Sequence, residues 1–157
     1  NDTYVTSTTD FSSCVVAKLD TEHDLAIIQL KNKKTPEDKY IFTVEEEDPL
    51  EVYNLKENIT KKICEDKNSK LFMMSFNLGP TLAMTKEGIK SQFNSGTISQ
   101  RTDDRLMYSI PALPGSSGSP VVNLRGQLVA INYAGINTTQ SFNYGIRVKH
   151  LRNLIMK

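Results

Sequence analysis

Short segments with the composition of β-strands recur along most of this chain, and this recurrence limits the fold more than any other feature. β-branched and aromatic residues are concentrated in these segments, which are bounded by Asp, Asn, Ser, Gly or Pro. The pattern predicts strands at residues 4–8, 14–19, 25–30, 40–44, 52–55, 71–76, 88–93, 96–100, 106–110, 120–124, 127–133 and 143–148.

The order of these segments predicts an all-β barrel protein that ends in a short helix. Residues 149–157 carry apolar side chains at helical spacing. The continuous apolar run at 25–30 predicts a strand that is buried on both faces. Residues 123–126, Asn-Leu-Arg-Gly, are typical of a tight hairpin between two strands.

Composition excludes several classes of function. The chain has 157 residues and a net charge of +1, so bulk charge indicates neither a nucleic-acid partner nor a membrane surface. No segment approaches the roughly 18 apolar residues that a transmembrane helix needs, so no membrane insertion is expected. The acidic run at 45–48 lacks the ligand spacing of a calcium loop and is predicted to be a solvated turn. No spacing of His, Cys and Asp resembles a metal site, and no cofactor is expected.

The two cysteines, Cys14 and Cys64, leave two interpretations open. They could form a single disulfide, or each could serve as a small apolar side chain.

The segment at 114–122, Pro-Gly-Ser-Ser-Gly-Ser-Pro-Val-Val, has the composition of a turn that presents a serine nucleophile. A hydroxyl nucleophile needs a tight turn that exposes its oxygen and directs backbone N–H groups toward the developing oxyanion. The glycines on either side allow backbone conformations that other residues avoid. By itself, such a segment is also compatible with a simple hairpin loop.

The surroundings of this turn resemble the trypsin-like (chymotrypsin-fold) serine proteases, and among them the HtrA-type bacterial proteases. Residues 115–120 resemble the family's Gly-(Asp/Asn)-Ser-Gly-(Gly/Ala)-Pro signature, with Ser116 and Ser119 as small departures from it. Four further segments resemble family segments in the same order along the chain: 24–30, 71–80, 95–99 and 142–148. The resemblance implies a double β-barrel with an incomplete first barrel over residues 1–68 and a second barrel with the terminal helix over 69–157.

The family's functional residues can be carried over onto matching positions of this chain. The resemblance implies that Ser117 attacks the scissile carbonyl and that the N–H groups of Gly115 and Ser117 form the oxyanion hole. It also implies that Asp24 orients a histidine base. Substrate contacts are expected at two three-residue segments: Pro111, Ala112 and Leu113 before the serine turn, and Asn132, Tyr133 and Ala134 along a strand edge.

No histidine occupies the position where the family has its base. His23 is adjacent to Asp24, and successive residues of a strand point to opposite faces. His150 lies in the predicted terminal helix, so both histidines are expected to be surface or packing residues. Residue 1 is expected to lie shortly after the missing histidine, and the chain as given is expected to be inactive.

These expectations favour a serine endopeptidase that cleaves peptides or proteins by acyl-enzyme chemistry, with the histidine outside this chain. The alternative is an inactive protease-fold module that binds extended peptides. The uncharged residues around the expected specificity pocket predict a preference for a small or medium apolar residue rather than Lys or Arg. Family habit implies a periplasmic or secreted location.

Overall fold

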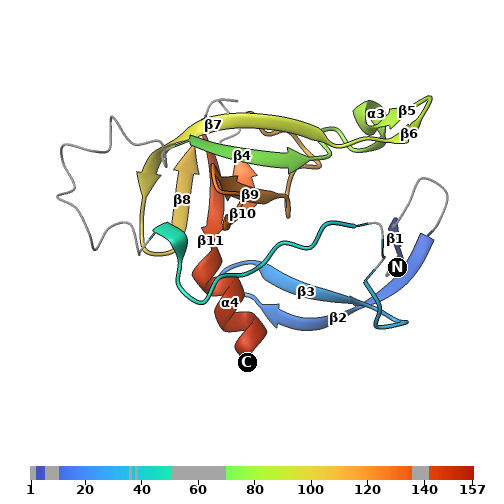
Figure 1. The fold of residues 1–157 in the computed structure, drawn as a ribbon, viewed down its shortest axis with the longest axis horizontal. Helices are drawn as coiled ribbons and strands as arrows, with labels where there is room; N and C mark the ends of the chain where they lie inside the picture. Colours follow the sequence, from blue (N-terminus) through green and yellow to red (C-terminus); the bar gives the residue numbers. More distant parts are fainter. Residues whose placement is uncertain (1–2, 6–10, 36, 38, 51–69, 136–141) are drawn as a thin grey trace.

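The computed structural model describes residues 3–5, 11–35, 37, 39–50, 70–135 and 142–157. Within this part the protein is mostly β-structure, with a closed barrel, a separate sheet and a short C-terminal helix. Figure 1 shows the barrel strands above and the separate sheet below, with the helix α4 (Val148–Met156) beside the sheet.

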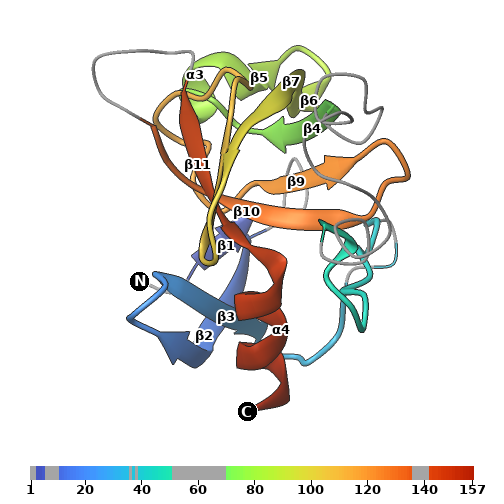
Figure 2. The same cartoon turned by 90° about the vertical axis from the view of Figure 1, so that its left-hand side faces the viewer.

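The barrel contains six antiparallel strands in the order β10-β11-β8-β7-β4-β9. It closes because β9 pairs with both β4 and β10. Figure 2 shows these strands from the side. Their bounds are β4 (Lys70–Ser75), β7 (Gln92–Arg101), β8 (Arg105–Tyr108), β9 (Pro120–Asn123), β10 (Leu128–Gly135) and β11 (Asn143–Arg147).

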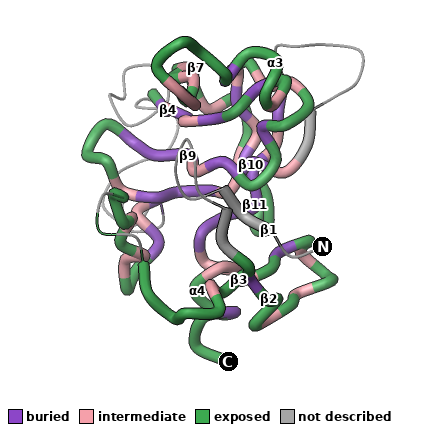
Figure 3. The backbone as a smooth tube through the Cα atoms, turned by 90° about the vertical axis from the view of Figure 1, so that its right-hand side faces the viewer, coloured by how far each residue is buried: buried purple, intermediate pink, exposed green. Residues whose placement is uncertain are grey.

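The main hydrophobic core lies inside this barrel. Alternate residues of β4 point inward, as the period of a strand requires, and Leu71 and Met73 are completely buried. Inward residues of the other strands complete the core, which includes Leu106, Tyr108, Ile110, Val121, Val129 and Ala130. Figure 3 shows that buried residues are concentrated in the barrel strands.

The separate sheet has three antiparallel strands, β1 (Thr3–Val5), β2 (Phe11–Asp20) and β3 (Leu25–Leu30). One face packs on the barrel and α4, where Leu25 contacts a cluster that contains Ile146 and Leu154. The prediction that 25–30 is buried on both faces is wrong, because Ile28 is 52% exposed. Its cross-strand partner, Val16, is also exposed, so the second face of this sheet is open in the described structure.

Three other expectations change in the structure. Residues 40–44 form no strand. Residues 88–100 form a two-residue strand, β6 (Gly88–Ile89), which pairs with β5 (Met84–Thr85), followed by the long strand β7. Gly96 lies within β7, where the backbone of Ile110 passes close to it. A Cβ atom at this position would be 2.5 Å from the backbone nitrogen of Ile110, so only glycine fits there. Residues 52–55 lie outside the described part of the chain.

Two local predictions are confirmed and one is corrected. The turn at 123–126 joins β9 to β10, and Gly126 adopts a φ of 76°. A helix follows β11 as expected, and a further short helix, α3 (Pro80–Ala83), follows β4. Asp48, expected in a solvated turn, is instead buried and forms an ion pair of 2.9 Å with Arg147.

Cys14 is buried in β2, and Cys64 lies outside the described residues, so the two interpretations of the cysteines stay open. Among the described residues, no helix is both long and apolar enough to cross a membrane.

Candidate active site

The turn that carries Ser117 depends on two glycines with positive φ. Gly115 has a φ of 97° and Gly118 a φ of 81°, a region that side chains with a Cβ atom rarely adopt. At Gly115 a Cβ atom would also lie 2.6 Å from the carbonyl oxygen of Phe76. Gly115 is therefore required for both its backbone conformation and its close packing against the segment after β4.

A buried asparagine fixes the turn from the barrel side. The Asn132 side chain donates hydrogen bonds to the carbonyl oxygen of Ser116 at 3.0 Å and to its hydroxyl at 3.1 Å. Its own Oδ1 accepts a hydrogen bond of 2.7 Å from the hydroxyl of Tyr108. The Asn132 backbone bonds to Gly118 and Ser119, each at 2.8 Å. Backbone and side chain of one residue thus hold the turn in place.

A second asparagine holds the start of the turn. Asn77, which is buried, accepts a hydrogen bond of 3.0 Å from the backbone N–H of Leu113. The N–H of Leu78 donates to the carbonyl of Pro114 at 2.6 Å. The segment after β4 and the start of the serine turn are therefore joined by two hydrogen bonds immediately before Gly115.

The hydroxyl of Ser117 is left exposed by this arrangement. It donates a hydrogen bond of 3.3 Å to the carbonyl oxygen of Tyr133. The N–H groups of Ser116, Gly118 and Ser119 donate to backbone carbonyls within the described structure. The N–H groups of Gly115 and Ser117 have no such acceptor among the described residues. These two backbone donors lie beside the exposed hydroxyl of Ser117 and could bind a developing anion.

Asp24 lies on the turn between β2 and β3, where its side chain is exposed. Its φ of 54° is in the left-handed region, which is uncommon for residues other than glycine. Asp24 and Tyr133 both line a cavity of about 100 Å³ at the junction of the sheet and the barrel. Ser117 is not among the residues that line this cavity, and it bonds instead to the backbone carbonyl of Tyr133.

The two segments expected to contact substrate differ in burial. Pro111 is exposed, Ala112 packs against the barrel core, and Leu113 is half-buried. Asn132 is buried and bonded within the barrel, as described above. Tyr133 is half-buried beneath the guanidinium of Arg105, and Ala134 pairs with Tyr144 of β11.

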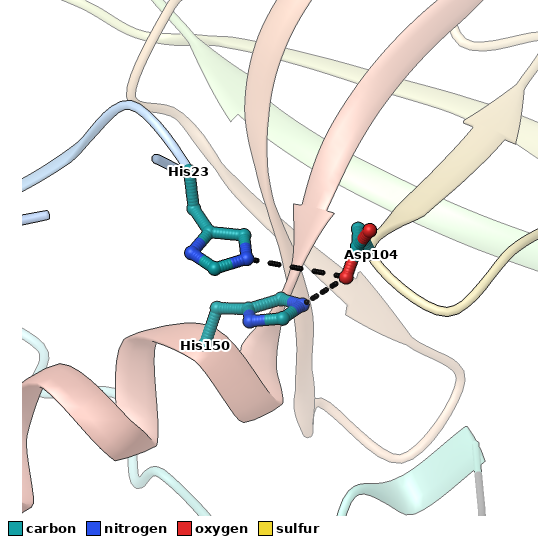
Figure 4. Close-up of side chains that lie close together, drawn as sticks. All are labelled: His23, Asp104 and His150. Atoms are coloured by element: carbon teal, nitrogen blue, oxygen red, sulfur yellow. Dashed lines mark ion pairs between the residues drawn. The ribbon is translucent and has the colours of Figure 1, made fainter. Parts of the chain in front are cut away.

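The two histidines, expected to be unrelated packing residues, lie against each other (Figure 4). Their rings stack with centroids 3.7 Å apart. The ring nitrogens of His23 face Asp20 at 2.8 Å and Asp104 at 3.9 Å rather than Asp24. Nε2 of His150 lies 3.1 Å from the Asp104 carboxylate. No local pattern in the sequence predicts this cluster, because its members come from three distant segments.

The cluster shifts two pKa values. The hydrogen bond from His23 lowers the pKa of Asp20. Burial lowers the pKa of His150, and the neighbouring charge of His23 lowers it further, while Asp104 acts in the opposite direction. His150 is thereby favoured in its neutral form.

Comparison with known proteins assigns this sequence to a family. The model of the trypsin-like peptidase domain matches residues 3–131. A search of curated proteins found no match.

Solved structures show the same fold at low sequence identity. The active form of the Rv3671c protease from Mycobacterium tuberculosis H37Rv has a TM-score of 0.63 and 12% identity, over 94% of this chain and 59% of that protein. A serine endoprotease from Yersinia pestis has a TM-score of 0.64 and 16% identity, over 94% and 44%. The HtrA-type protease AlgW, solved with a decapeptide, has a TM-score of 0.63 and 17% identity, over 94% and 40%. This chain thus spans less than two thirds of each of these proteins.

Proposed function

This chain belongs to the family of trypsin-like peptidase domains, and we propose that it is the nucleophile-bearing part of a serine endopeptidase. The observation that carries the proposal is the serine turn. Ser117 projects its hydroxyl from a turn that two asparagines and two positive-φ glycines hold in place. Such a fixed, exposed hydroxyl is what acyl transfer requires of a nucleophile.

In the proposed reaction the oxygen of Ser117 attacks the carbonyl carbon of the scissile peptide bond. The carbonyl oxygen becomes an oxyanion that the N–H groups of Gly115 and Ser117 stabilise by hydrogen bonds. A histidine base takes the serine proton and returns it to the leaving amine, and Asp24 orients that histidine. Water then hydrolyses the acyl-enzyme and releases Ser117.

We infer that the base is supplied by residues beyond these 157. The ring nitrogens of His23 and His150 face Asp20 and Asp104, and neither histidine bonds to Ser117 in the described structure. The open face of the three-stranded sheet offers a place for such residues, because Val16, Leu19 and Ile28 are exposed there. Further strands over this face would complete the first of two barrels and bury these side chains.

The proposed substrate is a peptide or protein segment in extended conformation. Tyr133 and Ala134 lie on β10 directly beside Ser117, where an extended chain could add along the strand. AlgW, which shares the fold, was solved with a decapeptide. Pro111, Ala112 and Leu113 carry no charge, so we propose an apolar residue before the cleaved bond rather than Lys or Arg.

A fluorophosphonate probe, which labels activated serines, tests the proposal on the complete protein. We expect labelling of the wild type and none of Ser117→Ala. Ser119→Ala is the matched control, since it removes a neighbouring hydroxyl of the same turn, and it should still be labelled. Labelling that persists in Ser117→Ala would contradict the assignment of the nucleophile.

Both histidines contact acidic side chains, Asp20 and Asp104, rather than Ser117. This favours a second candidate function, a module that binds extended peptides without cleaving them. The two functions differ in one measurement on the complete protein. A binding module would retain a peptide, as judged by fluorescence anisotropy, but would neither cleave it nor react with the probe.

A further inference from the structure

The strongest unassigned feature of the described structure is the cluster of His23, Asp104 and His150 (Figure 4). His23 lies on the turn between β2 and β3, Asp104 on the turn between β7 and β8, and His150 in the first turn of α4. The sheet, the barrel and the terminal helix thus each contribute one side chain to a common point. The serine chemistry proposed above uses none of the three.

The spacing of the three ligand atoms is close to that of a metal site. Nε2 of His150 is 3.1 Å from Oδ1 of Asp104, and Nε2 of His23 is 3.9 Å from the same oxygen. All three ligand atoms lie within 4.8 Å of one another. Two atoms that are each about 2.0–2.1 Å from a tetrahedral zinc ion are separated by roughly 3.3 Å. Small rotations of the side chains would therefore place one ion within bonding distance of all three.

The orientation of His23 is set by a second carboxylate. Its Nδ1 is hydrogen-bonded to Oδ2 of Asp20 at 2.8 Å. Asp20 is itself held by the backbone N–H groups of Glu22 and His23. A proton on Nδ1 leaves the lone pair of Nε2 directed toward Asp104. Histidine ligands of metal ions characteristically donate their other N–H to a carboxylate in this way.

His150 supplies a second, independent observation that points to a bound cation. Its Nε2 is buried and has no hydrogen-bond partner within the described structure, although Asp104 is near it. Its ring is stacked on that of His23, with the ring centroids 3.7 Å apart. A neutral imidazole is the form that binds metal ions.

The charges of the cluster match a divalent cation. Asp20 and Asp104 contribute two negative charges, and neutral histidines contribute none. The nearby ammonium of Lys149 bonds to Asp103 at 3.2 Å. Mg²⁺ and Ca²⁺ prefer shells made of oxygen atoms, whereas two imidazoles and one carboxylate suit zinc and similar transition-metal ions.

We propose that His23, Asp104 and His150 bind a Zn²⁺ ion, with Asp20 as the positioning residue for His23 and water in the fourth position. The ion joins the three-stranded sheet to the barrel and to α4. Because His23 adjoins Asp24, the ion also fixes the turn that carries Asp24. Its role is structural, and no step of peptide cleavage passes through it.

Zinc binding to the complete protein, prepared without a histidine tag, tests this proposal by equilibrium dialysis. We expect one equivalent of Zn²⁺ to bind the wild type. Asp104→Asn should weaken binding by about 100-fold or more, and Asp20→Asn by roughly 10–100-fold, because the latter removes only the partner of a ligand. Asp103→Asn is the matched control and should bind as the wild type does.

Two further measurements keep the proposal testable if a variant folds poorly. Proton NMR of the complete protein should show the ring signals of His23 and His150, identified by their loss in His23→Gln and His150→Gln, shifting together at one equivalent of Zn²⁺. A variant with serine at both Cys14 and Cys64 should bind zinc unchanged. Failure to bind zinc, equal binding by Asp104→Asn and Asp103→Asn, or loss of binding in the cysteine variant would overturn the proposal.

Discussion

The closed barrel and the three-stranded sheet are both antiparallel β-structure, yet they bury their apolar side chains very differently. Leu71, Met73 and Leu106 of the barrel are fully buried, whereas Leu19 and Ile28 of the sheet are more than half exposed. The strands of the sheet are even richer in apolar residues than those of the barrel. What differs is the number of neighbours, because every barrel strand has a partner on each side and an enclosed face. Strand composition therefore indicates a strand but does not determine its burial.

The same difference separates the two expected members of the active site. Ser117 belongs to the barrel, where buried side chains of Asn77 and Asn132 hold its turn. Asp24 belongs to an exposed turn of the sheet and has no described side-chain partner. The proposed nucleophile is thus positioned by the closed barrel, whereas the position of Asp24 depends on the contacts that hold the sheet against the barrel.

The largest effect is expected from breaking the buried ion pair that ties the segment after the sheet to the barrel. Asp48→Ala removes the partner of Arg147 and an acceptor for the N–H of Leu50. Leaving a buried charge without its partner costs about 3–5 kcal/mol, so urea unfolding should show a loss of that size. Glu47→Ala, at the exposed neighbouring position, is the control. Equal losses for the two variants would contradict the described burial.

Matched truncations in the two regions test the comparison directly. Leu106→Ala should lower the free energy of unfolding by about 2–5 kcal/mol, because it opens a cavity in the barrel core. Ile28→Ala should change it by less than about 0.5 kcal/mol in this chain, because the side chain is already exposed. A loss at Ile28 that approaches the loss at Leu106 would show that this face of the sheet is covered.

A smaller effect is expected from the asparagine that anchors the serine turn. Asn132→Ala leaves the hydroxyl of Tyr108 and the carbonyl of Ser116 without a buried partner, which should cost about 1–3 kcal/mol. It should also slow fluorophosphonate labelling of Ser117 in the complete protein. Asn153→Ala, on the exposed side of α4, is the control because it removes the same kind of amide group. It should change neither the free energy of unfolding nor the labelling rate. Normal labelling of Asn132→Ala would show that Asn132 does not anchor the serine turn.

The smallest effect concerns alkaline pH. Burial raises the pKa of the Tyr108 hydroxyl above its ordinary value of about 10. The unfolded chain therefore loses this proton first, so stability is full below pH 10 and falls as the pH rises further, by at most about 1.4 kcal/mol per pH unit from this group. Tyr108→Phe should make the decline of unfolding free energy above pH 10 less steep. An unchanged slope would show that Tyr108 ionises normally.

Local patterns predicted most of the strands because side-chain periodicity and turn residues act over a few positions. The hairpin at Gly126, the strands β4 and β9, and the terminal helix follow from such patterns. The errors arose where distant residues decide. The predicted strands at 88–93 and 96–100 left a break at residues 94–95, whereas β7 continues through them, and Gly96 admits the close approach of Ile110.

The sequence by itself determined the positions of most strands along the chain, the glycine-flanked serine turn and the resemblance to trypsin-like peptidases, because each depends on neighbouring residues. Only the tertiary structure decided which polar side chains meet. Asn132 beneath the serine turn, Asp48 beside Arg147, and His23 with Asp104 and His150 all come from segments far apart in the chain. Their contacts follow from how the sheet, the barrel and the helix pack, and no local spacing encodes that packing.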